Sequence, residues 1–376
     1  MSLGLYVHIP FCASRCPYCD FAFVVGRGHL SARYADAVGR EIRERVAKEF
    51  SGQVRFDTVF FGGGTPTAVT ASEIARILDA AASVAGLAQS AEITVEANPG
   101  AVDAGKFRDL RRLGVNRLSL GVQSFDDDEL RLLGRTHTSA EALRAYDAAR
   151  QAGFENVSLD LIFALPGQTE TAWQAHLDRA VGLGMEHIST YNLTVEPGTE
   201  FGGRLRRGRL TPLPEETQAA MYGAAIDRLT DAGYLHYEIS NFARPGLCAR
   251  HNLGYWEGSD YLGVGMSAHS FIVGRRTWNV RGLTRYLERI EGEGVAVAGQ
   301  ETLSPSERQT EAVLLGLRRV QEGVPVERIL DHRGGRRRID RLIADDLIER
   351  IGGRARLTRK GLMVADAIAV ELMGES

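Results

Sequence analysis

Three cysteines near the N-terminus have the spacing that most clearly suggests chemistry. Cys12, Cys16 and Cys19 form a C-x3-C-x2-C motif within the stretch LYVHIPFCASRCPYCDFAF. Thiolates are soft ligands that suit zinc or iron–sulfur clusters. A structural zinc ion would need a fourth Cys or His ligand, for which His8 and His29 are near in the sequence. A [4Fe–4S] cluster held by three cysteines would instead leave one iron open to a small chelating ligand.

Glycines and polar residues at the ends of strand-like runs could complete such a site. Gly62, Gly63 and Gly64 lie in FFGGGTP, and a backbone without Cβ atoms lets a ligand approach closely. Asp160 lies in the apolar run VSLDLIFALPG, where a lone acid is costly to bury unless it is paired or used. Arg135 is a candidate partner for Asp160 or for a ligand carboxylate, through a bidentate contact. A purely structural ion pair is the alternative.

The frame for these residues is predicted by strand-like runs that alternate with amphipathic stretches. The six strand-like runs are LYVHIP, DTVFFGGG, EITVEANP, RLSLGVQSF, NVSLDLIFALPG and HISTYNLTVEPG. Between them, an apolar stripe begins at Tyr34, TASE from Thr70 is a capping box, and Gly114, Gly153 and Gly184 would end helices. This order predicts an open, partial (β/α)6 barrel, with a doubly wound sheet as the alternative. In both folds the chemistry gathers at the carboxyl ends of the strands.

The chain is expected to divide into three parts. Residues 1–200 would form the partial barrel and residues 201–300 an extension of it. The Gly-, Arg- and Pro-rich stretch GGRLRRGRLTPLP from Gly202 is interpreted as an exposed linker. Residues 301–376 combine helical segments with the hairpin-like LIERIGGRARLT, whose turn lies at Gly352 and Gly353. This pattern predicts a C-terminal α+β module of winged-helix type.

Taken together, the cysteine motif after the first strand and GGGTP after the second resemble the radical S-adenosylmethionine (SAM) enzymes. The resemblance implies that SAM chelates the open iron and that an electron from the cluster cleaves it to methionine and a 5′-deoxyadenosyl radical. More narrowly, YVHIPFC, CPYCDF, FFGGGTP, VEANP, GVQSF, LLGRTH and LDLIFALPGQT resemble the oxygen-independent coproporphyrinogen III oxidase superfamily, over nearly the whole chain. In that family the SAM contacts fall at positions that match Tyr6, Tyr18, Gly63, Gly64, Thr65, Glu96, Gln123, Arg135, Asp160 and Thr194.

Two subfamilies differ at positions that this sequence contains. The oxidases extend the cysteine motif to C-x3-C-x2-C-x-C and carry a longer N-terminal arm, whereas here Phe21 stands at the fourth position and the first strand begins at Leu5. The haem chaperones of the HemW subfamily carry H-N-x-x-Y-W, and HNLGYW at residues 251–256 is similar. The sequence therefore resembles the haem chaperones more than the oxidases.

The HNLGYW motif has a physical logic for haem. A neutral imidazole is a common axial ligand of haem iron, and aromatic faces pack against a porphyrin. The resemblance implies that His251 is the ligand and that Tyr255 and Trp256 form an apolar wall. The alternative is a structural loop in which His251 bonds backbone groups and the aromatic rings fill the core. Cys248 and His269 are further candidate ligands, for which a buried or loop role is the alternative.

The function predicted from these motifs is a haem chaperone. It would bind haem and a SAM-ligated [4Fe–4S] cluster and deliver haem to an acceptor protein. The alternative is a radical SAM enzyme of the coproporphyrinogen III oxidase type. The motifs leave open whether SAM is consumed, which protein accepts the haem, and whether the chain forms a homodimer.

Composition excludes several other classes. The chain of 376 residues has 44% hydrophobic and 25% charged residues, as is typical of a soluble globular protein. A net charge of −3 argues against wholesale nucleic-acid binding, and only the Arg-rich turn with Arg333, Arg336, Arg337 and Arg338 would favour it. No apolar run approaches the roughly 20 residues of a membrane span, and no signal peptide is expected. A cytoplasmic location follows, where clustered cysteines bind metal rather than form disulfides.

Overall fold

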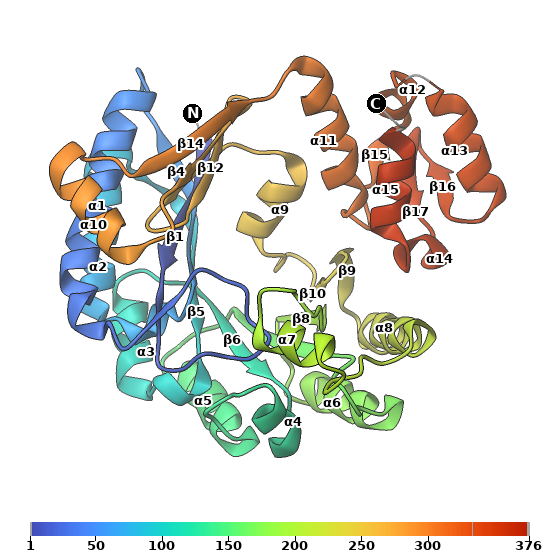
Figure 1. Cartoon of the computed structure of the whole chain (residues 1–376), viewed down its shortest axis with the longest axis horizontal. Coiled ribbons are helices and arrows are strands. Elements are labelled where there is room, and N and C mark those ends of the chain that lie inside the picture. Colours follow the sequence, from blue (N-terminus) through green and yellow to red (C-terminus); the bar gives the residue numbers. More distant parts are fainter. Residues whose placement is uncertain (1, 333, 374–376) are drawn as a thin grey trace.

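A computed structural model describes residues 2–332 and 334–373 of the chain. Its centre is a curved sheet in which the strands follow the order β14-β13-β12-β11-β1-β4-β5-β6-β7-β8-β10-β9 (Figure 1). Seven neighbouring strands are parallel, namely β11 (Tyr261–Val264), β1 (Ser2–Ile9), β4 (Arg55–Gly63), β5 (Leu87–Ala97), β6 (Arg117–Gln123), β7 (Val157–Phe163) and β8 (His187–Asn192). The six strands expected from the sequence are therefore present and parallel, which confirms the partial barrel.

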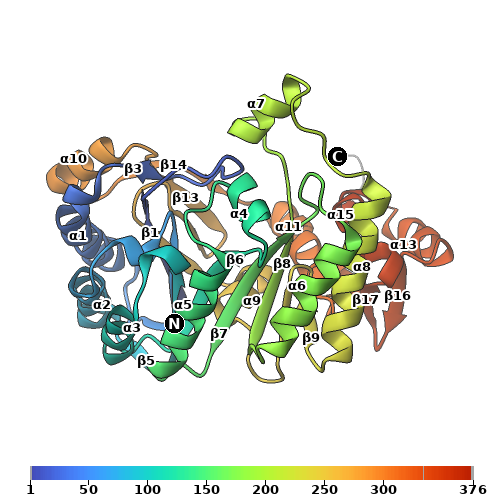
Figure 2. The ribbon, with the colours of Figure 1, turned by 90° about the horizontal axis from the view of Figure 1, so that it is seen from below.

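Helices cover the outer face of the parallel strands, as Figure 2 shows. Each lies between two strands in the chain, and those from α1 to α6 belong to the strand–helix–strand connections that join parallel neighbours. The helices are α1 (Ser31–Glu49), α2 (Ala71–Ala85), α3 (Ala104–Arg112), α4 (Asp127–Leu132), α5 (Ser139–Gln151), α6 (Glu170–Gly182) and α8 (Glu215–Asp231). Short 3-10 helices occupy Gly28–Leu30, Pro66–Ala68 and Pro99–Ala101.

Local signals account for where these helices begin, pack and end. Tyr34, Val38, Ile42 and Val46 of α1 are buried against the sheet, as the stripe predicts. Thr70 caps α2 in a reciprocal capping box with Glu73. The expected cap glycines 114, 153 and 184 have φ of 92°, 85° and 68°, a backbone conformation that a residue with a Cβ rarely adopts.

The segment after β8 supplies both edges of the sheet. Strands β9 (Leu235–Glu238) and β10 (Asn241–Ala243) form an antiparallel edge beside β8. On the opposite side, β11 pairs with β1, and the antiparallel strands β12 (His269–Ile272), β13 (Arg275–Asn279) and β14 (Val297–Thr302) follow. Helix α10 (Leu283–Glu293) connects β13 to β14. The strands between residues 235 and 302 thus belong to the same sheet as the barrel.

The expected exposed linker is wrong in its first half. Helix α7 (Glu200–Arg206) occupies that part, and Gly202 and Gly203 are buried. Phe201 anchors the helix in a small apolar cluster with Leu133 and Leu165, far from it in sequence. A Cβ on Gly202 would lie 2.2 Å from a backbone oxygen, so the glycine permits close packing rather than flexibility.

The C-terminal part is a separate layer of helices around a small sheet (Figure 1). Its elements are α11 (Pro305–Leu317), β15 (Val324–Pro325), α12 (Val326–Leu330), α13 (Gly335–Ala344), β16 (Ile348–Ile351), β17 (Arg354–Leu357), α14 (Arg359–Leu362) and α15 (Ala365–Met373). The expected hairpin is present, and its turn residues Gly352 and Gly353 both have positive φ. In the Arg-rich turn Arg336 and Arg337 are exposed, whereas Arg333 lies outside the described residues. Within residues 2–332 and 334–373, no helix has the length and apolarity needed to cross a bilayer.

Candidate functional site

The three cysteines lie on one loop at the carboxyl end of β1. Cys12 ends the short strand β2 (Phe11–Cys12), which pairs in parallel with β3 (Val24–Val25). Cys16 and Cys19 follow in a turn, where the Cys19 N–H donates to the Cys16 carbonyl at 3.2 Å. All three line one cavity of about 480 Å³. Partial burial raises the pKa of the Cys12 and Cys19 thiols, so metal binding would have to displace their protons.

The zinc alternative finds no support in this geometry. Among the described residues, no three His, Cys, Asp or Glu side chains converge on a point that could hold a single metal ion. Both nitrogens of His8 are already engaged, Nδ1 with the Tyr6 hydroxyl at 3.1 Å and Nε2 with the Ala22 carbonyl at 2.7 Å. His29 lies on an exposed 3-10 helix. Three cysteines that line one cavity suit a cluster in which each thiolate takes a different iron.

The glycines at the end of β4 pack so closely against β1 and the cysteine loop that neither position has room for a Cβ. A Cβ on Gly64 would lie 2.7 Å from the Pro10 carbonyl oxygen and 3.0 Å from Cys12 Sγ. Gly63 has φ of 114°, and a Cβ there would lie 2.7 Å from the ring of His8. The floor of the cavity is therefore bare backbone beside the cysteines. This cradle fits a ligand that must approach the cluster closely.

Nearly all of the SAM-contact positions expected from the sequence meet in this cavity. They come from β4 to β8 and the segments that follow these strands, from the cysteine loop and from the segment after α4, and they line a common space. They are Tyr18, Gly63, Gly64, Thr65, Glu96, Gln123, Arg135, Asp160 and Thr194. Tyr6 differs, because it lines two adjoining cavities instead.

Two ionisable side chains of the cavity, Arg135 and Glu96, have unusual surroundings. The Arg135 guanidinium donates to the Gly121 carbonyl at 2.9 Å and approaches Cys16 Sγ at 3.9 Å, so a cation stands beside the thiols. Its Nε is buried and has no partner among the described residues. Burial, together with the neighbouring charge of Asp160, raises the pKa of Glu96 to about 8. Glu96 is therefore largely protonated at neutral pH and can donate a hydrogen bond.

The expected pairing of Arg135 with Asp160 is wrong. Asp160 accepts hydrogen bonds from three serines, Ser119 at 3.0 Å, Ser189 at 2.8 Å and Ser158 at 3.3 Å. These serines come from β6, β7 and β8, so neighbouring strands place them at the same level. Burial nevertheless raises the pKa of Asp160. The repeated serine in RLSLG, VSLDL and HISTY was a signal that could have identified this arrangement.

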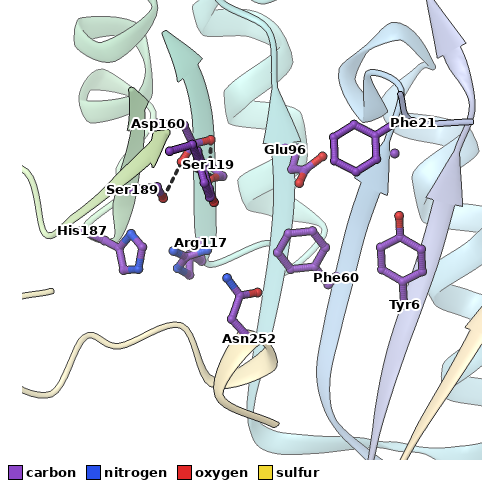
Figure 3. Close-up of a pocket in the computed structure, with 12 residues that line it drawn as sticks. Tyr6, Phe21, Phe60, Glu96, Arg117, Ser119, Asp160, His187, Ser189 and Asn252 are labelled. Carbon is purple, nitrogen blue, oxygen red and sulfur yellow. Dashed lines mark hydrogen bonds between the residues drawn. The ribbon is translucent and has the colours of Figure 1, made fainter. Parts of the chain in front are cut away.

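A second cavity, of about 220 Å³, contains residues that the sequence did not single out (Figure 3). It shares Glu96 and Asp160 with the first, and Arg117 and Asn252 also line it. Arg117 is 2% exposed, its Nε is buried with no hydrogen-bond partner among the described residues, and its charge acts on Glu96 and Asp160. Its position at the start of an otherwise apolar strand was the available signal.

The HNLGYW motif forms helix α9 (Arg250–Glu257), which lies between the sheet and α11 (Figure 1). His251 is 3% exposed and lines none of the three cavities. Its Nδ1 is 2.8 Å from the Thr58 hydroxyl and its Nε2 is 2.9 Å from the Tyr255 hydroxyl. Burial lowers its pKa to about 3. Haem ligation by His251 would therefore require one of these bonds to break.

The two aromatic residues of the motif lie on different sides of α9. Tyr255 lines a third cavity, beside β12 and β13. Trp256 packs under the Arg318 guanidinium, 5.0 Å from the ring centre, at the C-terminal module. The motif thus differs from the structural loop considered as the alternative: it is helical, His251 bonds side-chain hydroxyls rather than backbone groups, and both aromatic rings are only half-buried. Cys248 is half-buried and lines none of the three cavities.

Comparisons with known proteins agree with this geometry. The sequence profile of the Radical SAM superfamily matches residues 6–180. The protein named heme chaperone HemW from Bacillus subtilis is 36% identical and is aligned over 98% of this chain and 99% of its own length. HemW from Escherichia coli is 40% identical over 76% of this chain and 77% of its own length. The crystal structure of coproporphyrinogen III oxidase (HemN) from E. coli, a radical SAM enzyme, has a TM-score of 0.83 and 25% identity over 98% of this chain and 89% of that one.

These similarities extend well beyond the cysteine loop. They include the sheet edges and the C-terminal module, which a radical SAM core alone would not explain. The chain therefore belongs to the radical SAM superfamily and, within it, to the HemW family of haem chaperones.

Proposed function

We propose that this protein is a haem chaperone that binds haem together with a SAM-ligated [4Fe–4S] cluster and delivers haem to an acceptor protein. The observation that carries the proposal is the match to HemW proteins over nearly the full length of both chains. The cavity beside the three cysteines supports the cluster and SAM, because bare glycine backbone and polar side chains surround it.

Several residues of the cavity have proposed roles. Cys12, Cys16 and Cys19 would each hold one iron, and the cluster, when bound, supplies an open iron and one-electron chemistry. Arg135 would offset the negative charge of the thiolates and of a carboxylate ligand. The serine-held carboxylate of Asp160 would accept hydrogen bonds from a hydroxylated ligand, and Gly63 and Gly64 would bring backbone groups close to it.

We also propose a division of labour along the chain. Residues 1–200 would carry the cluster and SAM, residues 201–300 the haem contacts, and residues 301–376 a surface for the acceptor protein. Trp256 and Arg318 lie where the last two parts meet, so α9 would contact both the haem-binding part and the part that binds the acceptor protein.

The second candidate is a radical SAM enzyme of the coproporphyrinogen III oxidase type. It is favoured by the structural similarity to HemN, which covers nearly the whole chain. Against it, Phe21 occupies the position of the fourth cysteine in the oxidase motif, and its side chain is 71% exposed beside the cavity.

One experiment separates the two candidates. The cluster is reconstituted without oxygen in the wild-type protein and in a variant in which all three cysteines are replaced by serine. Haem binding, haem release to an apo-haem protein and coproporphyrinogen III turnover are then measured. The chaperone proposal expects haem transfer without turnover. Decarboxylation of coproporphyrinogen III by the wild type, lost in the cysteine variant, would establish the second candidate instead.

A further inference from the structure

A third cavity, of about 440 Å³, lies next to the cysteine cavity, between β1 and the hairpin of β12 and β13. Phe21 lines all three cavities, and Tyr6 lines both the second and the third; Figure 3 labels both residues in the wall of the second cavity. The third cavity is within the size range of small-molecule and cofactor sites. Phe21 is the lining residue that the third cavity shares with the cysteine cavity.

The wall of this cavity combines polar groups with several aromatic rings. Tyr255, from the HNLGYW motif, meets Tyr261 edge to face, with ring centres 4.7 Å apart. Trp278 on β13 and the exposed ring of Phe21 complete the set. Flat aromatic surfaces suit a flat macrocyclic ligand, because they bury large apolar areas without losing polar contacts. Tyr255 therefore connects the haem-associated motif to an accessible cavity.

Two histidines line the cavity, and only one has free ring nitrogens. His8 has both nitrogens in hydrogen bonds. His269 is exposed at the start of β12 and stacks on Trp278 at 6.2 Å, and no hydrogen bond occupies its nitrogens within the described residues. Partial burial and the nearby Arg276 and Arg281 lower its pKa, which keeps the imidazole neutral at pH 7, as an iron ligand must be.

A cation stands at the edge of the same cavity. Arg281 is exposed, lines the cavity, and forms no ion pair or hydrogen bond in the part of the chain that the structure describes. A guanidinium binds carboxylates through two parallel hydrogen bonds. A free imidazole, an aromatic wall and a free guanidinium thus occur together, and they match the iron, the ring and the propionates of haem.

We infer that haem binds in this third cavity, with His269 as an axial ligand of the iron and Arg281 facing a propionate. The inference rests on the proposed haem-chaperone function and names the site at which it acts. His251 then has a structural role: it orients Tyr255, the motif residue that contacts the ligand.

The test uses ferric protoporphyrin IX titrated into the full-length protein with its cluster reconstituted. Optical and electron paramagnetic resonance spectra are compared for the wild type and for His269→Ala, His251→Ala and His29→Ala, the last being an exposed histidine outside the three cavities. The His269→Ala variant is expected to lose the histidine-ligated spectrum and to regain it with added imidazole. The His29→Ala variant should match the wild type. A thermal unfolding scan shows whether each variant is folded.

A second arm tests the propionate contact. Arg281→Ala should weaken haem binding by up to about five-fold, as for one exposed charge pair, and should not change binding of haem dimethyl ester. The inference is overturned if His269→Ala keeps the wild-type spectrum, or if a folded His251→Ala variant alone loses it. If the wild type itself binds no haem, the proposed function fails, which is a different outcome from misplacing the ligand.

Discussion

Replacing Gly64 by alanine should disrupt the cysteine loop although all three cysteines are retained. The added Cβ would lie 2.7 Å from the Pro10 carbonyl oxygen, whereas ordinary van der Waals contacts begin near 3.4 Å, so a displacement of about 0.7 Å is needed. Neither partner can move freely, because the Gly64 N–H donates to the Ile9 carbonyl at 2.8 Å and the Val24 N–H donates to the Pro10 carbonyl at 2.7 Å.

The magnitude follows from these contacts. Overpacking costs about 1–3 kcal/mol, and losing the Val24 bond adds about 1 kcal/mol, so the free energy of unfolding of the apoprotein should fall by about 2–4 kcal/mol. Cys12 lies two residues from Pro10 and would also be displaced, since the new Cβ stands 3.0 Å from its Sγ. Iron incorporation during reconstitution should therefore decrease as well.

The assay is urea unfolding of the apoprotein together with iron and sulfide determination after reconstitution. Gly52→Ala is the matched control, because an added Cβ there meets no atom within 4 Å and the change should cost less than about 0.5 kcal/mol. If Gly64→Ala unfolds at the same urea concentration as Gly52→Ala and binds as much iron, the steric reasoning is refuted.

Three further results are expected. In the folded protein the pKa of Glu96 is about 8, against an ordinary value of 4.5, so the free energy of unfolding of the apoprotein should fall as pH rises between these values. Urea unfolding midpoints at pH 5.5 and pH 8 should therefore differ less in Glu96→Gln than in the wild type. An equal difference in the two proteins would contradict the raised pKa. His251→Ala removes the hydrogen bonds of His251 with Thr58 and Tyr255 and leaves a void, so calorimetry should show that the free energy of unfolding falls by about 2–4 kcal/mol. A fall of less than about 1 kcal/mol would be inconsistent with these contacts. Glu257→Ala breaks a partly exposed ion pair with Arg319 and should cost less than about 1 kcal/mol by the same measurement; a larger cost would mean that this pair anchors α9 to the C-terminal module.

Features of the fold that depend on neighbouring residues were predictable from the sequence. Thr70 and Glu73 form the expected capping box, and the stripe beginning at Tyr34 packs where its period places it. The pairing of β11 with β1 was not predictable, because about 250 residues separate the two strands and no local pattern specifies the partner. The same applies to α7, which is held by Phe201 in a cluster assembled from distant segments.

In the candidate site, too, the features set by short motifs were predictable and those set by distant residues were not. The cysteine spacing and the glycines identified the cavity, because both signals lie within short motifs. Asp160 was paired with the wrong partner, since the serines that hold it come from three strands. The state of His251 depends on Thr58, which is 193 residues away, so the motif alone could not show that its nitrogens are engaged.

The exposed ring of Phe21 would couple the binding of two ligands. One side chain forms part of the wall of every cavity described above. Whatever orientation a first ligand imposes on that ring is the one that a second ligand encounters. Thermodynamic linkage then requires the effect to be mutual: the factor by which SAM alters the affinity for haem equals the factor by which haem alters the affinity for SAM. Loading and unloading would thus be coupled through the rotation of one phenyl group.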